Sequence, residues 1–355
     1  MNNKSKTTGN TGEWSELYAL MHILSNGGMY AADSSQNKIE DIFYEVIKAI
    51  LHNQSGKILY LKDDKNITAS LNGEVLGVVK QDKLRKILKE MFSALKEKNE
   101  GRAYELSTGE DALNLLFKNG IKASSSKKKD IDLVLLDIKT KIPTPETGFS
   151  IKSQLGSPST LINASKATNF TFEVLDENGQ IPQTIPKLHP KNVKDNIGLL
   201  LEEGYQLKLF GVDSVIFEKN LKLIDANLPE YLASILISYY SRRANKISDL
   251  VGETSFSDKN HARFKIKEFL STMALGMMPN KEWDGILTTL GGFILVKSDG
   301  DVLCYYLYNL DEFREYLISI TKLETPSTTR YGIGSIYQES GKYFLKLNLQ
   351  VRFLK

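Results

Sequence analysis

The chain of 355 residues lacks the features that mark disulfide-rich, membrane or exported proteins. Its single cysteine, Cys304, excludes an internal disulfide and a cysteine-rich metal site, so a reducing cytoplasm is the expected setting. No apolar run reaches about 18 residues, and the N-terminal segment MNNKSKTTGN lacks the apolar region of a signal peptide. We therefore expect a cytoplasmic protein with no membrane segment.

The charged residues are nearly balanced, so total charge says little about partners. The formal net charge is only +3, and binding surfaces must be inferred from local clusters. Hydrophobic residues make up 41% of the chain, enough for a large core, and the length predicts two domains or one elaborated domain. The histidines have no metal-ligand spacing and are treated as ordinary residues: His22, His52, His189 and His261.

The segment GNTGEWSELYALMHIL, residues 9–24, predicts the first helix. Asn10 and Glu13 have the spacing of a capping box, in which each side chain satisfies a backbone N–H of the other. Leu20 and Ile23 flank Glu16, which predicts a partly buried carboxylate. Such a group is costly unless a cation or metal meets it, and a salt-bridged structural glutamate is the alternative.

Residues 37–120 are predicted to have a structural role. The segment IEDIFYEVIKAIL, 39–51, predicts a helix, and KILYL, NITASL and EVLGVV predict three short strands. A long amphipathic helix follows, with apolar residues at helical spacing from Leu84 to Leu95 and lysines on its far face.

A lysine lies in the middle of GFSIKSQ, residues 148–154, which otherwise reads as a buried strand. Period-two alternation makes one face of this strand entirely polar: Ser150, Lys152 and Gln154. The apolar segment 131–138 precedes it, and the loop KTKIPTPETG between them predicts an antiparallel hairpin. A solvated edge strand would explain the polar face, but the buried partner strand favours a lysine that points into a cleft.

The hairpin is expected to bring acidic and basic groups to one end of a sheet. Asp130 and Asp132 lie near the start of its first strand, and Lys152 lies in its second. Phosphodiester hydrolysis uses such a set, because carboxylates hold Mg²⁺ against the phosphate while a lysine orients or deprotonates the attacking water. Glu16 from the first helix can complete the set.

Longer stretches are more specific than this constellation: GEWSELYAL, YAAD, GFSIKSQLGSPSTLINASKATNF, TPSTTRYG and KLNLQVRF. Together they resemble the HpaII-type restriction endonucleases, with matches from residue 12 to residue 353. A helix glutamate, an aspartate before a strand and a lysine on the next strand also follow the order of the PD-(D/E)XK nuclease superfamily. The resemblance implies a mixed α/β fold with a PD-(D/E)XK core.

The resemblance also implies a function. Members of this family are type II restriction endonucleases that cleave double-stranded DNA with Mg²⁺, with CCGG as the family's target. A cognate DNA methyltransferase protects the host, and the pair serves phage defence.

Carried onto this sequence, the resemblance implies catalytic roles for Glu16, Asp130, Lys152 and Gln154, and metal ligation by Asp130 and Asp132. The superfamily usually has an acidic residue two positions before the lysine, where this chain has Ser150. A hydroxyl is a poor Mg²⁺ ligand, so another carboxylate must come from Glu16, Asp132 or the loop residue Glu146. Gln154 is a candidate donor of an amide oxygen. One metal ion is expected, and a second is left open.

Polar and basic groups outside this centre suggest contacts with DNA. Neutral donors and a lysine follow the catalytic strand and suit the phosphate backbone, although turn and capping roles explain them equally well: Asn163, Ser165, Lys166, Thr168 and Asn169. Arg242 and Arg243 lie within a predicted helix at 228–251, on either a solvated face or a phosphate-contacting surface. Arg330, in the loop TPSTTRYG, has the side chain that reads guanine bidentately.

We therefore predict a nuclease core in residues 1–180 and a region for DNA recognition and dimerisation in residues 181–355. A palindromic target favours a homodimer on DNA, because matched symmetry places identical loops over both half-sites. Two other functions stay open at this point. One is a non-catalytic DNA-binding protein on a nuclease fold, which Ser150 favours, and the other is a repair or methylation-dependent nuclease.

Overall fold

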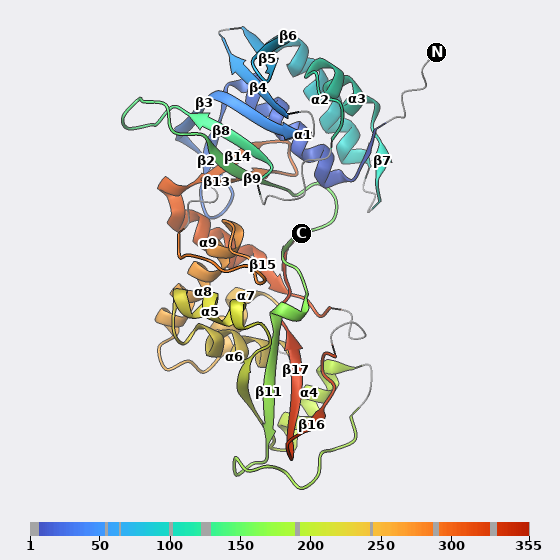
Figure 1. Ribbon diagram of the computed structural model, residues 1–355, viewed down its shortest axis with the longest axis vertical. Helices are drawn as coiled ribbons and strands as arrows, with labels where there is room; N and C mark the ends of the chain where they lie inside the picture. Colours follow the sequence, from blue (N-terminus) through green and yellow to red (C-terminus); the bar gives the residue numbers. More distant parts are fainter. Residues whose placement is uncertain are drawn as a thin grey trace. The chain divides into compact units, whose positions relative to one another are not determined.

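The computed structural model describes residues 7–53, 56–63, 65–98, 102–121, 129–188, 192–241, 244–286, 291–326 and 332–354. The fold is mixed α/β, and the chain forms two compact units; Figure 1 labels many of their helices and strands. Unit 1 comprises Met1–Ser159 and Leu287–Phe313, and unit 2 comprises Thr160–Ile286 and Arg314–Leu354. Within the described ranges, no helix is long and apolar enough to cross a membrane.

Unit 1 is built on a nine-stranded sheet with one layer of helices. The strands lie in the order β2 (Gly28–Ala32), β14 (Val302–Tyr306), β13 (Gly292–Val296), β9 (Thr147–Ser153), β8 (Ile131–Leu135), β3 (Lys38–Asn53), β4 (Gly56–Lys62), β5 (Asn66–Leu71) and β6 (Glu74–Lys80). The helices are α1 (Thr11–Asn26), α2 (Gln81–Glu97) and α3 (Ser107–Leu115), and β1 (Thr8–Gly9) pairs with β7 (Tyr104–Glu105).

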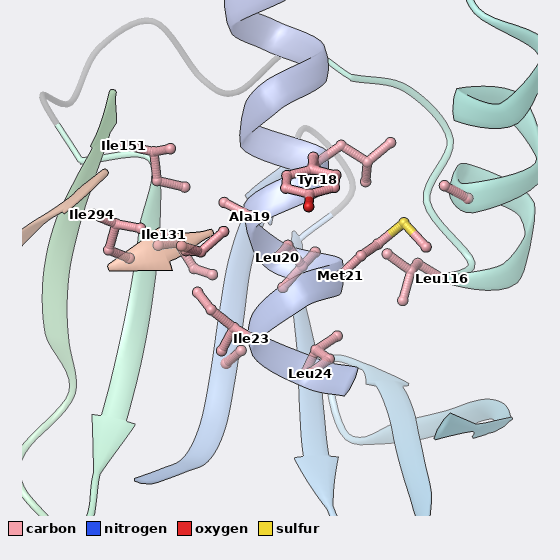
Figure 2. Packing of buried hydrophobic residues seen from close by; sticks show 14 of the residues in the cluster. Tyr18, Ala19, Leu20, Met21, Ile23, Leu24, Leu116, Ile131, Ile151 and Ile294 are labelled. Carbon is pink, nitrogen blue, oxygen red and sulfur yellow. The ribbon is translucent and has the colours of Figure 1, made fainter. Parts of the chain in front are cut away.

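Helix α1 is buried on several sides because it packs on the sheet and also contacts α2 and α3. Figure 2 shows Ile23 on the side of the helix that faces Ile131 of β8, whereas Met21 points toward Leu116 at the end of α3. The capping box predicted at Asn10 and Glu13 is confirmed at its start. This packing fixes the position and rotation of the helix that carries Glu16.

The predicted hairpin is also confirmed. Strands β8 and β9 pair antiparallel, with Ile131 opposite Phe149 and Leu133 opposite Thr147. Phe149 and Ile151 face the core shared with α1, so the polar residues of GFSIKSQ lie on alternate positions, as the period-two pattern predicted.

The helix predicted at residues 39–51 is wrong, because this segment forms most of the long strand β3. Its buried residues are Tyr44, Val46, Ala49, Ile50 and Leu51. A bulge between Val46 and Lys48 interrupts the alternation in the pairing with β8. Because of the bulge, the spacing of the apolar residues matches the period of a helix, whereas the β-branched and aromatic residues favour a strand.

Strand β13 explains why the later segment Leu287–Phe313 belongs to unit 1. It pairs in parallel with β9, from Gly292 opposite Phe149 to Val296 opposite Ser153, and antiparallel with β14. The sequence suggested a boundary at residue 180, whereas the chain leaves unit 1 after Ser159 and returns at Leu287. The pairing of distant segments has no local sequence signal.

Unit 2 contains two smaller sheets and most of the remaining helices. Its four-stranded sheet has the order β12 (Gln206–Val212), β11 (Asn169–Leu175), β17 (Lys342–Asn348) and β16 (Tyr337–Glu339), and its three-stranded sheet has the order β10 (Thr160–Ile162), β18 (Val351–Phe353) and β15 (Thr321–Leu323). Its helices are α4 (Val193–Glu202), α5 (Val215–Ile224), α6 (Leu228–Tyr240), α7 (Ile247–Glu253) and α8 (Lys259–Ala274), and α9 (Leu310–Ile320) begins with residues assigned to unit 1 and ends with residues assigned to unit 2. The single helix predicted at 228–251 is wrong, because α6 ends at Tyr240 and α7 begins at Ile247.

A tight contact between α1 and α3 lies close to Glu16. Trp14 of α1 is fully buried, and its Nε1–H donates to the carbonyl oxygen of Tyr104 at 3.2 Å. A Cβ added to Gly109 of α3 would lie 2.3 Å from Cζ3 of this indole ring. The ring has little freedom to move, so glycine is required here by space.

Gly109→Ala is therefore expected to lower the free energy of unfolding by about 1–3 kcal/mol, although alanine is the better helix former. The matched control is Gly198→Ala in α4, where no described atom lies within 4 Å of the added Cβ. That variant should gain up to about 1 kcal/mol. Urea unfolding of both variants tests the contrast, and a stabilised Gly109→Ala would contradict the close approach of α3 to Trp14.

Candidate active site

Glu16 lies between the helix layer and the hairpin β8–β9. It is half-buried and lines a cleft of about 300 Å³ together with Lys152 and residues at the start of α1. Burial, and after it the nearby charge of Asp130, raise its pKa to about 8, although Lys152 and Lys118 act in the opposite direction. Glu16 is therefore within electrostatic reach of both residues that the sequence placed with it.

Asp130 is held rigidly by the neighbouring strand. Its backbone N–H donates to the carbonyl oxygen of Phe149 at 2.9 Å, and its Oδ2 accepts from the N–H of Ile151 at 2.6 Å. The hydroxyl of Ser150 also donates to Oδ2 at 3.3 Å. Burial raises the pKa of Asp130, whereas these hydrogen bonds and Lys152 lower it. The hydroxyl of Ser150, two positions before Lys152, thus helps to orient the carboxylate of Asp130.

A small cavity of about 20 Å³ adjoins the same groups. Glu16, Asp130, Lys118 and His52 line it together with apolar residues of α1 and the strands. Its volume is close to that of one water molecule, and its polar lining could satisfy one. Glu16 lines both this cavity and the cleft, so it lies where the interior and the open side of the site meet.

Lys118 was not predicted from the sequence. It follows α3, where Phe117 has a left-handed backbone with φ of +54°, and the N–H of Lys118 donates to the carbonyl oxygen of Leu113 at 2.9 Å. This turn directs the lysine inward, and its Nζ donates to the carbonyl oxygen of Ile121 at 3.2 Å. Burial lowers its pKa to about 8, and Glu16 acts to raise it. No spacing in the sequence relates it to Glu16, because tertiary packing alone brings them together.

Asp132 is placed differently from Asp130. It is buried, its two oxygens each lie 2.6 Å from Nζ of Lys129, and Oδ2 also lies 2.6 Å from Nε2 of His52. The charge of Asp132 is thus already compensated by side chains. Of the two carboxylates proposed for the metal, Asp130 is the one whose charge raises the pKa of Glu16.

Two further candidates lie outside this group. Oε1 of Gln154 accepts from the N–H of Ser298 at 3.1 Å, and its Nε2 donates to Oε1 of Gln36. Glu146 is exposed and its Oε1 lies 3.2 Å from Nζ of Lys48. The structure does not bring either residue to Glu16 and Asp130.

The residues proposed for DNA binding also fall into distinct settings. Asn163 and Lys166 are exposed and Ser165 is half-buried, whereas Thr168 and Asn169 are buried. The Nδ2–H of Asn348 donates to Oδ1 of Asn169 at 2.7 Å and to Oγ1 of Thr168 at 3.2 Å, so both side chains are bonded within unit 2. Arg242, Arg243 and Arg330 lie outside the described residues.

The carboxylates of Glu16 and Asp130 suit a Mg²⁺ ion that has few protein ligands. The described part of the chain contains no group of three or more His, Cys, Asp or Glu side chains that could hold a metal ion. Glu16 and Asp130 nevertheless offer hard carboxylate oxygens, and Mg²⁺ commonly uses one or two carboxylates together with water and substrate phosphate. Burial and the charge of Asp130 both disfavour the ionised form of Glu16, and a dication would favour that form.

The pKa of Glu16 predicts a pH dependence of stability without metal. The folded state binds a proton up to about pH 8, whereas an unfolded chain releases it near 4.5, so stability falls as the pH rises through this interval. Glu16→Gln mimics the protonated form and removes the loss. It should exceed wild type by on the order of 2 kcal/mol at pH 8.5, and match it near pH 4.5.

Urea unfolding in EDTA across this pH range measures the difference. Glu90→Gln, at an exposed position of α2, is the control for replacing a helix glutamate by glutamine. A Glu16→Gln offset that does not change with pH would contradict the raised pKa of Glu16.

Two comparisons with known proteins point to the same family. A family model described as HpaII restriction endonuclease matches residues 10–353. The type II restriction enzyme HpaII of Haemophilus parainfluenzae is 39% identical over 367 residues, which cover 98% of this chain and 99% of that protein. No solved structure matches the chain significantly. The resemblance seen in the sequence is thereby confirmed: this chain belongs to the HpaII restriction endonuclease family and is a type II restriction enzyme, which cleaves DNA in a sequence-specific manner.

Proposed function

We propose that this enzyme cleaves double-stranded DNA at CCGG with Mg²⁺, and that Glu16, Asp130 and Lys152 form its catalytic centre on a PD-(D/E)XK core. The observation that carries the proposal is the position of Glu16, which lines one cleft with Lys152 and the adjoining small cavity with Asp130. The charges of both residues act on the pKa of Glu16. The three residues also come from the first helix, the start of a strand and its antiparallel neighbour, in the order of that superfamily.

Each protein group has a defined task in this proposal. Bound Mg²⁺ would neutralise charge on the scissile phosphate and make a water molecule more acidic. Asp130 and Glu16 supply the carboxylates, and the amide of Ile151 and the hydroxyl of Ser150 keep Asp130 in one orientation. Lys152 orients the attacking water and offsets the negative charge that develops on the phosphate.

Lys118 contributes from the interior side. Its ammonium lowers the pKa of Glu16, and both residues line the small cavity behind the cleft. We assign it the role of stabilising the ionised form of Glu16, which is the form that can bind a cation.

The remaining functional elements follow from the target. CCGG reads identically on both strands, so we propose a homodimer whose two copies contact equivalent half-sites, with recognition and dimerisation in residues 181–355. A cognate DNA methyltransferase would protect the same sequence in the host.

Lys152→Ala and Asp130→Ala are expected to abolish turnover while leaving DNA affinity largely intact, because affinity is spread over many phosphates and bases. Single-turnover cleavage of unmethylated CCGG duplex with Mg²⁺ should be measured beside binding of the same duplex. Lys57→Ala is the control, since this lysine is exposed and lies 3.9 Å from Glu146. Cleavage by Lys152→Ala within about tenfold of wild type would remove Lys152 from the catalytic set.

Arg330→Ala is expected to slow cleavage of the specific site, because losing a bidentate contact with guanine costs about 1–3 kcal/mol of binding or transition-state free energy. The measurement compares cleavage of CCGG with cleavage of singly substituted sites. Unchanged rate and unchanged site preference would exclude Arg330 from recognition.

A further inference from the structure

The ion pair between Asp213 and Lys346 in unit 2 joins two strands that are not neighbours in their sheet. Asp213 follows β12 and Lys346 lies in β17, and Nζ of Lys346 is 2.6 Å from Oδ2 of Asp213. Strand β11 lies between them, with Thr171 directly opposite both Lys346 and Gly211. The side chains of Asp213 and Lys346 remain 21% and 29% exposed, so the pair is accessible from one side.

Buried polar groups fix the orientation of Asp213. The hydroxyl of Thr171 donates to Oδ1 at 2.6 Å, and Nδ2–H of Asn169 donates to Oδ2 at 3.3 Å. Behind them, the buried amide of Asn348 holds Asn169. Burying polar side chains is costly, and a partly exposed ion pair adds little stability, so stability alone does not account for this arrangement. What the network provides is a carboxylate and an ammonium in one fixed geometry.

The pair also lies where two segments proposed for DNA contact enter the sheet. Ile333, just after the segment that contains Arg330, forms a bridge with Lys346, and the N–H of Gly334 donates to the carbonyl oxygen of Lys346 at 2.8 Å. On the other side, exposed Lys166 begins the short 3₁₀ turn that leads into Asn169 and β11. Two segments that are distant in sequence thus converge on this end of the sheet.

We propose that Asp213 and Lys346 together read one G·C base pair in the major groove and so determine specificity. The inference rests on the proposed function, because its target consists only of G·C pairs. Cytosine presents its N4 amino group as a donor and guanine presents O6 and N7 as acceptors, which an adjacent carboxylate and ammonium complement. An ammonium has three N–H donors, and within the described residues one is used by Asp213.

The same sheet contains a matched control. Lys342 lies four positions before Lys346 in β17 and on the same face, and its Nζ is 2.9 Å from Oε1 of Glu173. It shares strand, face and type of ion pair with Lys346. Strand β17 joins the segment of Ile333 at Lys346, whereas Lys342 lies at the opposite end of the strand, opposite Glu339.

The test uses full-length wild type, Lys346→Met, Asp213→Asn and Lys342→Met. Binding is measured in Ca²⁺ to a CCGG duplex, to duplexes with each base pair substituted, and to a duplex without the site. Lys346→Met and Asp213→Asn should lose about 10- to 100-fold in affinity for CCGG, with discrimination relaxed at one base pair and its symmetry mate. Affinity for the site-free duplex should stay within about threefold, and Lys342→Met should match wild type on all duplexes.

The alternatives give different results. An equal loss of affinity for every duplex would indicate a phosphate contact and overturn the inference. Variants that discriminate between CCGG and substituted sites as the wild type does, but melt at a lower temperature, would also overturn it. If Lys346→Met fails to fold, Lys346→Gln answers the same question with a polar side chain. If the wild-type enzyme shows no preference for CCGG, the proposed target is wrong. If the wild type prefers CCGG and both variants keep that preference, only the proposed reading of the G·C pair by Asp213 and Lys346 is wrong.

Discussion

The burial of the Glu16 carboxylate beside a second carboxylate, Asp130, is the constraint that governs the site of unit 1. Glu16 and Asp130 are close enough for the charge of one to raise the pKa of the other. Their separation is fixed because α1 is packed between the sheet and two helices, and Asp130 is fixed by hydrogen bonds from β9. Ionisation of Glu16 therefore places a second negative charge in a half-buried site, where a cation can offset it, and the rigid packing prevents the side chains from moving apart.

Local patterns were sufficient for the elements that carry this site. The capping box at Asn10, the hairpin around GFSIKSQ and the partial burial of Glu16 all depend on neighbours within a few residues or on one simple alternation. The strand β3 was missed for an equally local reason, since one bulge disrupted its alternation. The approach of Lys118 to Glu16 and the pairing of β13 with β9 required tertiary structure, because neither has a pattern within one segment.

The sequence also could not separate functional polar residues from structural ones. Thr168 and Asn169 have the composition of a DNA-contacting loop, yet their side chains are buried and bonded to Asn348. Ser150 had seemed to weaken the case for catalysis, and its hydroxyl in fact donates to Asp130. In both cases the type of residue was informative only once its hydrogen-bond partner was known.

The place of β13 in the sheet has a consequence for synthesis on the ribosome. Chains emerge from their N-terminus, and β9 has only β8 beside it until residues 292–296 are made. Nearly the whole of Thr160–Ile286, which belongs to unit 2, is therefore translated while the strand that carries Lys152 is still a sheet edge. The sheet around Lys152 can therefore be completed only after most of the chain, including Thr160–Ile286, has been made.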